Sequence, residues 1–154
     1  MAACDPSAML AYPYATVPAG RAELAALTAL VAETDPIEVF VGLPRSLSGG
    51  EGPAAQKARE RAAALARALS AAGLDVTVRL LDERLTTVSA ARQLRESGRR
   101  AKDQRSVIDS AAAVTILEHA LAAERAQGKA PGELVSPKDL SASAPDEPRL
   151  EELR

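Results

Sequence analysis

The sequence predicts an α/β fold, in which helices cover a sheet that is at least partly parallel. Two short runs of mainly β-branched and aliphatic residues alternate along the chain with longer segments of helical periodicity. The 154 residues are enough for one domain with a single sizeable core. Only 2% of the residues are aromatic, so aliphatic side chains must fill that core, and platforms for base stacking are scarce.

The chain is expected to open with a proline-interrupted segment and a helix. Three prolines lie within residues 1–20 and allow only short extended pieces around residues 9–12. Residues 21–33 carry aliphatic side chains at helical spacing, and Asp35-Pro36 ends that pattern.

Two strands are expected on either side of a long helix. Residues 37–43 form a nearly continuous apolar run between two prolines, which is typical of a buried strand. The glycine-rich loop 45–52 leads into an Ala- and Arg-rich helix that begins at Pro53 and ends at Gly73. Residues 75–81 then alternate apolar and polar side chains, which predicts the second strand.

The last part of the domain is expected to hold two helices. The first begins where Thr86 or Thr87 can cap its free N–H groups and runs to about residue 97. A polar, basic loop follows at residues 98–104, and residues 106–126 show the periodicity of the second helix.

The domain is therefore expected to occupy residues 1–127. Residues 128–154 are rich in Pro, Ser, Gly and charge and lack a sustained apolar period, so they are expected to form a disordered tail.

Charge is spread unevenly, although the net value is only −2. Residues 55–105 hold 12 Lys/Arg against 6 Asp/Glu, whereas residues 133–154 hold 3 against 6. A charge run is more often a solvated face, but this basic region could also bind phosphates. Its most concentrated part consists of Arg92, Arg95, Arg99, Arg100, Lys102 and Arg105.

Composition excludes several classes of protein. Cys4 is the single cysteine, so no internal disulfide can form, and Cys4 with the single histidine, His119, cannot make a Cys/His zinc site. Any metal must therefore be held by oxygen ligands, and His119 is expected to be structural or exposed. No apolar stretch approaches the roughly 20 residues of a membrane helix, and no signal peptide is evident. A soluble, cytoplasmic protein without a membrane partner is expected.

Two groups of carboxylates are candidates for chemistry. Asp82 and Glu83 follow the second predicted strand, at the strand end where open α/β sheets place their ligands. The alternative is a solvated turn with a local ion pair to Arg84. Asp109 is expected in the first turn of the last helix, pointing toward the body, where it could instead compensate the helix dipole by about 0.3–1 kcal/mol. The loop 45–52 could present backbone N–H groups and Arg45 to a phosphate, but it lacks the ending of a P-loop.

Three segments occur in an order that is more specific than any one of them. They read VFVGLP at residues 39–44, LDERLTT at residues 81–87 and VIDSAAA at residues 107–113. Together they resemble the YqgF (RuvX) family of RNase H-like proteins over about residues 2–126. The resemblance implies an RNase H-like fold with a mixed sheet flanked by helices. It also implies an acidic site for Mg²⁺ or Mn²⁺ in which Glu83 and Asp109 are catalytic metal ligands.

The resemblance further implies a first central strand that precedes this chain. Family members open with a strand carrying an Asp-x-Gly motif, which supplies the first catalytic carboxylate, and residues 1–5 match the end of the next strand. Asp5 lies past that strand and is not expected to take the missing role. A chain without the first strand should fold poorly and hydrolyse little. One explanation is initiation at an internal GTG codon, which an upstream frame without Asp-x-Gly would exclude.

The family resemblance implies that this protein is a metal-dependent nuclease, which hydrolyses phosphodiester bonds and processes the 5′ end of pre-16S rRNA in ribosome biogenesis. The expected partners are structured RNA and the pre-ribosomal particle. Two alternatives remain: a non-catalytic RNase H-like module that binds rRNA or an assembly partner, and a Holliday junction resolvase on DNA, which would need a dimer. The side chains expected to contact the nucleic-acid backbone are Arg45, Arg84, Arg99, Arg100 and Lys102.

Overall fold

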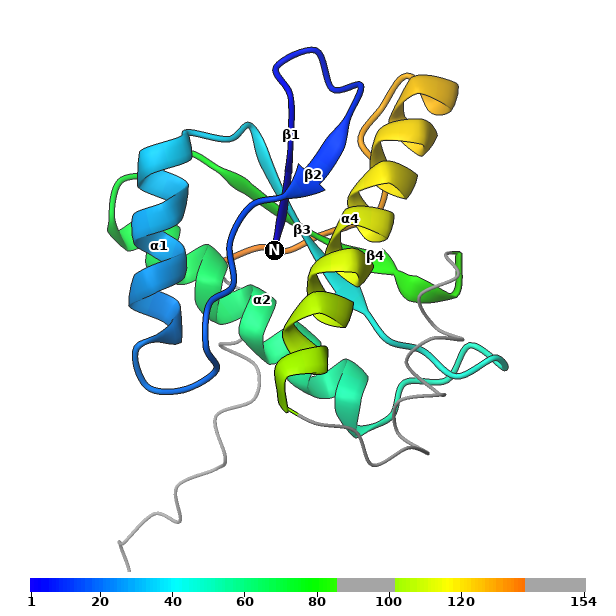
Figure 1. The fold of residues 1–154 in the computed structure, drawn as a ribbon, viewed down its shortest axis with the longest axis horizontal. Coiled ribbons are helices and arrows are strands. Elements are labelled where there is room, and N and C mark those ends of the chain that lie inside the picture. The colour runs from blue at the N-terminus through cyan, green and yellow to red at the C-terminus, as the bar shows by residue number, and fades with distance from the viewer. Residues whose placement is uncertain (86–101, 138–154) are drawn as a thin grey trace, which may run out of the picture.

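The structure, a computed structural model, describes residues 1–85 and 102–137 (Figure 1). In chain order the elements are β1 (Ala2–Cys4), β2 (Ala11–Pro13), α1 (Glu23–Thr34), β3 (Glu38–Leu43), α2 (Pro53–Ala71), β4 (Thr77–Asp82), a short 3-10 turn (Glu83–Leu85), α4 (Lys102–Gln127) and β5 (Glu133–Leu134).

The described strands form two separate sheets. β3 and β4 pair in parallel, from Glu38 opposite Thr77 to Leu43 opposite Asp82, and β5 adds to β4 in the antiparallel direction. β1 and β2 form an antiparallel hairpin of their own. The mixed sheet flanked by helices confirms the α/β fold class, whereas an additional central strand upstream of Met1 stays a prediction.

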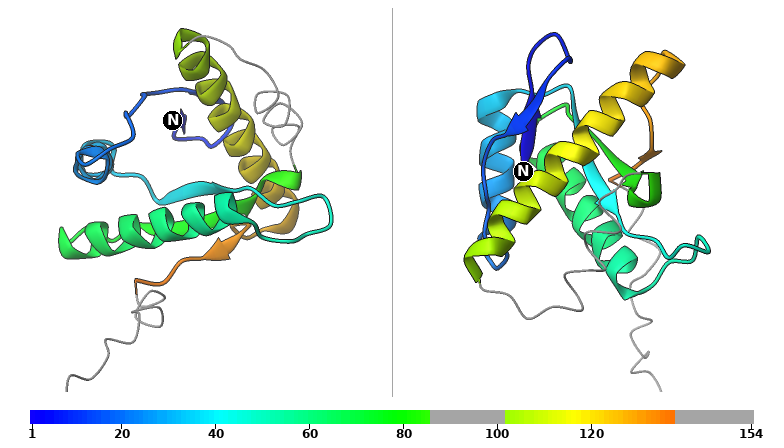
Figure 2. Two further views of the ribbon diagram at one scale, coloured as in Figure 1. Left: turned by 90° about the horizontal axis from the view of Figure 1, so that it is seen from below. Right: turned by 45° about the vertical axis from the view of Figure 1, so that its right-hand side comes forward.

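Helices cover both faces of the three-stranded sheet (Figures 1 and 2). α2 packs on β3 and β4, and α1 packs on α2. α4 contacts the hairpin and β3 on the other side. The ends of β3 and β4 therefore lie between two helical layers, which is where the candidate carboxylates are.

The core lies between α2 and the sheet and is almost purely aliphatic. Alternate strand residues such as Leu43, Val78 and Leu80 are at most 3% exposed and pack against small α2 side chains. The α2 residues buried there are Ala55, Ala62, Ala63, Leu65, Ala66 and Leu69. Burying a Leu or Val side chain contributes roughly 1.5–3 kcal/mol, so this layer fixes both strands without aromatic residues, as expected.

The four elements predicted between residues 21 and 81 are confirmed with boundaries shifted by a few residues. Gly73 has a φ of +72°, as a glycine after a helix end often does. α4 begins at Lys102, so residues 102–104 belong to a helix and not to the predicted loop. The helix expected from Thr86 to about residue 97 lies outside the described residues.

The predicted tail begins too early, because residues 128–137 belong to the fold. Leu134 lies opposite Arg79 in the sheet, and the Val135 amide donates to the Val78 carbonyl at 2.9 Å. Val135 is also 8% exposed and joins the core. A strand this short shows no apolar period in the sequence, since backbone hydrogen bonds to β4 hold it. Residues 138–154 lie outside the described part of the chain.

The N-terminal hairpin contains the extended pieces expected there and explains Asp5. The Asp5 carboxylate accepts hydrogen bonds from the amides of Ser7 (3.1 Å), Met9 (2.9 Å) and Leu10 (2.6 Å). The bonds from Leu10 and Met9 lower the pKa of Asp5. Asp5 thus organises the turn between β1 and β2, and the structure gives it no place among the candidate metal ligands.

Candidate functional site

Glu83 is a buried carboxylate at the carboxyl end of β4. Its side chain is 3% exposed, and it is the one charged residue that is buried among those whose side chains the structure describes. The carboxylate lies over Gly42 of β3: a methyl group at Gly42 would overlap Glu83 Oε1 and would lie 3.0 Å from Ile116 Cδ1 of α4. Glu83 therefore points into the layer between the sheet and α4. Burial of a carboxylate costs several kcal/mol unless hydrogen bonds or a cation offset it.

Asp82, the neighbour of Glu83, has a different environment. Its Oδ1 accepts a hydrogen bond from the Arg84 backbone amide at 2.9 Å, and its Oδ2 accepts one from Arg84 Nη2 at 2.6 Å. The side-chain hydrogen bond from Arg84 is the largest of the effects that lower the pKa of Asp82. The local ion pair that the sequence left open thus exists for Asp82, while Glu83 points inward.

Asp109 lies on α4 but is placed differently from the prediction. Because α4 begins at Lys102, Asp109 is the eighth helical residue, beyond the first turn where a helix dipole acts strongly. It is exposed, not buried against the body. Asp109 lies seven residues before Ile116, so both are on one stripe of the helix. Burial lowers the pKa of the Met1 ammonium group, and the negative charge of Asp109 partly opposes that shift.

The two carboxylates suit part of a hard-cation site. Mg²⁺ is commonly bound by one or two carboxylates together with water and substrate phosphates. Glu83 comes from a strand end and Asp109 from the helix that covers the same face of the sheet, so their donor type fits Mg²⁺ or Mn²⁺. Among the side chains that the structure describes, in residues 1–84 and 109–137, no group of three or more His, Cys, Asp or Glu could hold a metal ion. The pair would therefore need further oxygen ligands from water, from substrate or from other parts of the protein.

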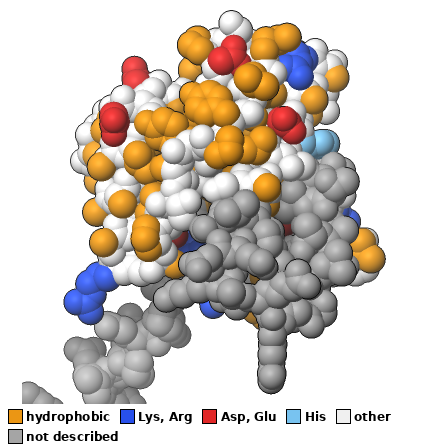
Figure 3. Space-filling model, in the orientation of Figure 1, with side chains coloured by type: hydrophobic (Ala, Val, Ile, Leu, Met, Phe, Trp, Pro, Cys, Tyr) orange, Lys and Arg blue, Asp and Glu red, His pale blue; other side chains and the backbone are white. Residues whose placement is uncertain are grey.

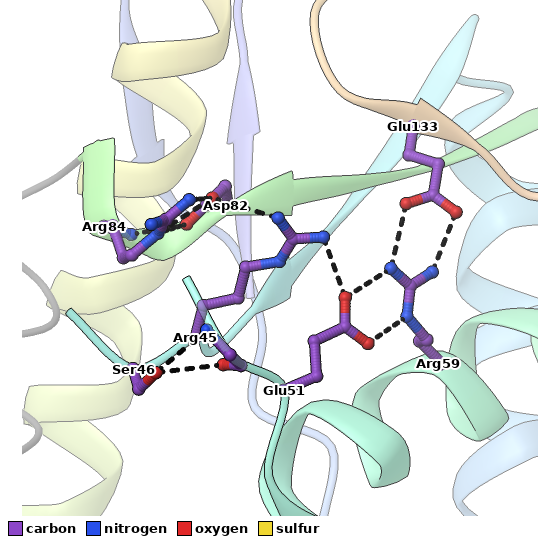
Figure 4. Close-up of polar contacts among 8 residues, drawn as sticks. Arg45, Ser46, Glu51, Arg59, Asp82, Arg84 and Glu133 are labelled. Atoms are coloured by element: carbon purple, nitrogen blue, oxygen red, sulfur yellow. Dashed lines mark hydrogen bonds and ion pairs between the residues drawn. The ribbon is translucent and has the colours of Figure 1, made fainter. Parts of the chain in front are cut away.

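Six charged residues form a continuous ion-pair chain on the α2 side of the same strand ends (Figure 4). Arg84 pairs with Asp82, and Arg45 Nη1 lies 3.7 Å from Asp82 Oδ2. Arg45 Nη2 also binds Glu51 Oε1 at 2.8 Å. The chain continues through Arg59, which contacts Glu51 at 2.6 Å and Glu133 at 2.8 Å. We call Arg84, Asp82, Arg45, Glu51, Arg59 and Glu133 the ion-pair chain.

Charge compensation in the ion-pair chain is strongest at its centre. The hydrogen bond from Arg59, followed by that from Arg45, lowers the pKa of Glu51 to about 2. Hydrogen bonds to Glu51 and Glu133 in turn raise the pKa of Arg59. The chain connects the loop after β3, α2, the end of β4 and β5, which lie up to 74 residues apart in sequence.

The predicted contacts to a nucleic-acid backbone are only partly placed. Arg45 and Arg84 lie beside the strand ends and keep 27% and 30% of their side chains exposed, but carboxylates already bind both. Arg99 and Arg100 lie outside the described residues, as does the side chain of Lys102. Arg59 and Glu133 were missed, and no sequence signal could have found a pair whose members are so far apart.

Two further surfaces adjoin the site. A hollow of about 240 Å³ lies at the edge of β4, with Asp82, Arg45 and the half-buried His119 among its lining residues.

Figure 3 shows a second surface, where apolar side chains gather and few Lys or Arg are visible. The exposed apolar residues of the hairpin are Met9, Leu10, Tyr12 and Tyr14. That apolar face offers little electrostatic attraction for phosphates.

A mixed sheet flanked by helices, with a buried Glu at one strand end and an Asp on the helix above it, defines an α/β protein of the RNase H-like class. The family model described as "RuvX: Holliday junction resolvase" matches residues 1–123. The chain belongs to this family.

Several relatives of this chain are named "Putative pre-16S rRNA nuclease". The protein from Streptomyces avermitilis is 57% identical over 86% of this chain and 84% of its own length. The protein from Nocardioides is 54% identical over 88% of this chain and 87% of its own length. The protein from Mycobacterium tuberculosis is 53% identical over 77% of this chain and 68% of its own length.

None of the helices in the described residues is long and apolar enough to cross a membrane.

Proposed function

We propose that this protein is a metal-dependent nuclease that hydrolyses phosphodiester bonds in structured RNA, and that its substrate is precursor 16S rRNA near the 5′ end. The observation that carries the proposal is the buried carboxylate of Glu83 at the carboxyl end of β4. A carboxylate is rarely buried unless it is compensated, and strand ends are where α/β proteins bind ligands. The names of the relatives support the choice of substrate.

Each part of the site has a role in this proposal. Glu83 and Asp109 would bind Mg²⁺ or Mn²⁺, which when bound can activate a water molecule and stabilise the leaving oxygen. Glu83 would act from a fixed position on the sheet, and exposed Asp109 would act from the solvent side of the same layer. Arg45 and Arg84, with Arg99, Arg100 and Lys102, would bind phosphates flanking the scissile bond. The pre-ribosomal particle would be the setting of the reaction.

The test is cleavage of a precursor 16S rRNA transcript by the purified protein. We expect cleavage to require Mg²⁺ or Mn²⁺, to stop with EDTA, and to map near the 5′ end of the mature sequence. Glu83→Gln and Asp109→Asn should abolish it. Glu118→Gln should not, because Glu118 is exposed on α4. Tight RNA binding without cleavage under any metal would instead support a non-catalytic rRNA-binding module.

A second candidate function is the cleavage of four-way DNA junctions, because the matched family model carries that description. A resolvase makes paired cuts and therefore needs two sites related by symmetry. The same preparation should be given junction DNA and precursor rRNA in parallel, and its mass in solution measured. Symmetric nicking of the junction by a dimer, with the rRNA left intact, would favour this second function.

A further inference from the structure

The direction of the Glu83 side chain depends on its immediate neighbours. Along β4 the side chains alternate, so that Val78 and Leu80 face α2. Asp82 continues this side of the strand and joins the ion-pair chain. Glu83 begins the 3-10 turn and lies on the opposite side, against Gly42. If the turn rotated, Asp82 would enter the buried layer, and Glu83 would move to the side where arginines compensate the carboxylates.

Asp82 holds the backbone on both sides of Glu83. Its Oδ1 accepts the hydrogen bond from the Arg84 amide, so a ring of contacts closes around the Glu83 peptide unit. The same carboxylate also receives Arg84 Nε, at 3.1 Å from each oxygen, and Arg84 Nη2 at 2.6 Å. Turns of this kind are set by an Asp side chain that bonds to a backbone N–H two residues later.

Arg84 and Gly42 complete the restraint. The Arg84 guanidinium lies over Gly49, where an added methyl group would come within 3.1 Å of Nη1. Gly42 forms the floor beneath the Glu83 carboxylate, and any larger residue there would displace it. The Glu83 carboxylate thus lies over the backbone of β3 at Gly42, near the side chain of Ile116, while the Asp82–Arg84 pair holds the turn from the other side of the strand.

We infer that Asp82 is a positioning residue: through its bonds to the Arg84 amide and guanidinium it fixes the turn that directs the Glu83 carboxylate into the layer between the sheet and α4. This inference rests on the proposed function, because that function makes Glu83 a metal ligand. Groups that orient a metal ligand commonly change metal affinity about 10–100-fold when they are removed. Removing a member of an ordinary surface ion pair would change the metal affinity little.

The experiment compares Asp82→Ala and Asp82→Asn with Asp75→Asn, which removes the same charge from an exposed position just before β4. Mn²⁺ affinity is measured by titration with electron paramagnetic resonance detection. We expect Asp82→Ala to weaken Mn²⁺ binding about tenfold and to lower kcat with little change in KM. Asp82→Asn keeps an oxygen acceptor for the Arg84 amide, so its loss should be smaller. Asp75→Asn should match the wild type.

A second measurement needs no metal and no activity. The ¹³C resonance of the Glu83 carboxyl carbon in metal-free protein reports the environment of that side chain. It should shift or broaden in Asp82→Ala and stay in place in Asp75→Asn, with far-ultraviolet circular dichroism confirming that both variants are folded.

These outcomes separate the two ideas. If the Asp82 variants bind Mn²⁺ like the wild type and leave the Glu83 resonance unchanged, Asp82 is not a positioning residue, whatever the protein cleaves. If the resonance moves but the wild type neither binds Mn²⁺ nor cleaves RNA, the positioning role stands and the proposed function fails.

Discussion

The two sides of the strand ends use carboxylates in opposite ways. On the α2 side, half-buried Asp82 and exposed Glu51 belong to the ion-pair chain, and arginines compensate both. On the α4 side, Glu83 is buried within the protein and Asp109 is exposed at the surface of the covering helix. Adjacent residues in sequence therefore serve different purposes, because a strand sends successive side chains to opposite faces. The α2 side thus carries carboxylates that arginines compensate, and the α4 side carries the two carboxylates that we propose as metal ligands.

The largest expected effect is the loss of metal-dependent stabilisation when Glu83 is changed. Mn²⁺ at about 100 times its dissociation constant should raise the unfolding free energy of the wild type by roughly 2.7 kcal/mol. Glu83→Gln should remove this gain. Urea unfolding with and without Mn²⁺ measures the effect, and Glu118→Gln serves as the control. An unchanged metal effect in Glu83→Gln would contradict its role as a ligand.

The next effect concerns the floor of the site. Gly42→Ala should destabilise the protein by about 1–3 kcal/mol, because the added methyl group overlaps the Glu83 carboxylate and presses on Ile116. It should also weaken Mn²⁺ binding. Gly52→Ala is the matched control, since nothing lies within 4 Å of a methyl group there. Equal unfolding midpoints for the two variants would show that Glu83 does not rest on Gly42.

A smaller effect is expected in the ion-pair chain. Arg59→Met should cost about 1 kcal/mol or less, because Arg59 is partly exposed and solvent screens its pairs. The loss should concentrate at β5, which Glu133 connects to α2. Hydrogen exchange of the Val135 amide should therefore quicken more than that of the strand interior. Arg61→Met, which alters a longer and more exposed pair with Glu23, should leave that exchange rate unchanged.

The smallest effect is the response to acid. The pKa of Glu51 is lowered to about 2, chiefly by Arg59, so the folded protein holds this proton less tightly than the unfolded chain does. Its contribution to stability is fully present above the unfolded pKa near 4.5 and is lost as pH falls from there toward 2. The increment should be smaller in Arg59→Met. Urea midpoints at pH 6 and pH 3 measure it, and identical pH dependence in both proteins would rule out the Arg59–Glu51 explanation.

Sequence reasoning succeeded where the signal was local. The apolar run of β3, the proline at the start of α2 and the glycine after its end each act within a few residues, and the corresponding elements are confirmed. It was wrong about the start of α4 and about β5. The first error arose because the charged and polar residues 102–105 at the start of α4 show no apolar helical period. The second arose because pairing with a buried strand can order a segment that has little apolar content of its own.

By itself, the sequence determined the α/β class, the aliphatic core and the choice of Glu83 and Asp109 as candidate ligands. Periodicity and residue type encode the first two features locally, whereas Glu83 and Asp109 were chosen from the resemblance of three ordered segments to the RuvX family. Only the tertiary structure decided that Glu83 is buried over Gly42 while Asp82 pairs with Arg84 and Arg45. Only the tertiary structure brought Arg59 to Glu133. The direction of a side chain at a strand end, and its partners from distant segments, depend on how the layers pack, and no local pattern records that.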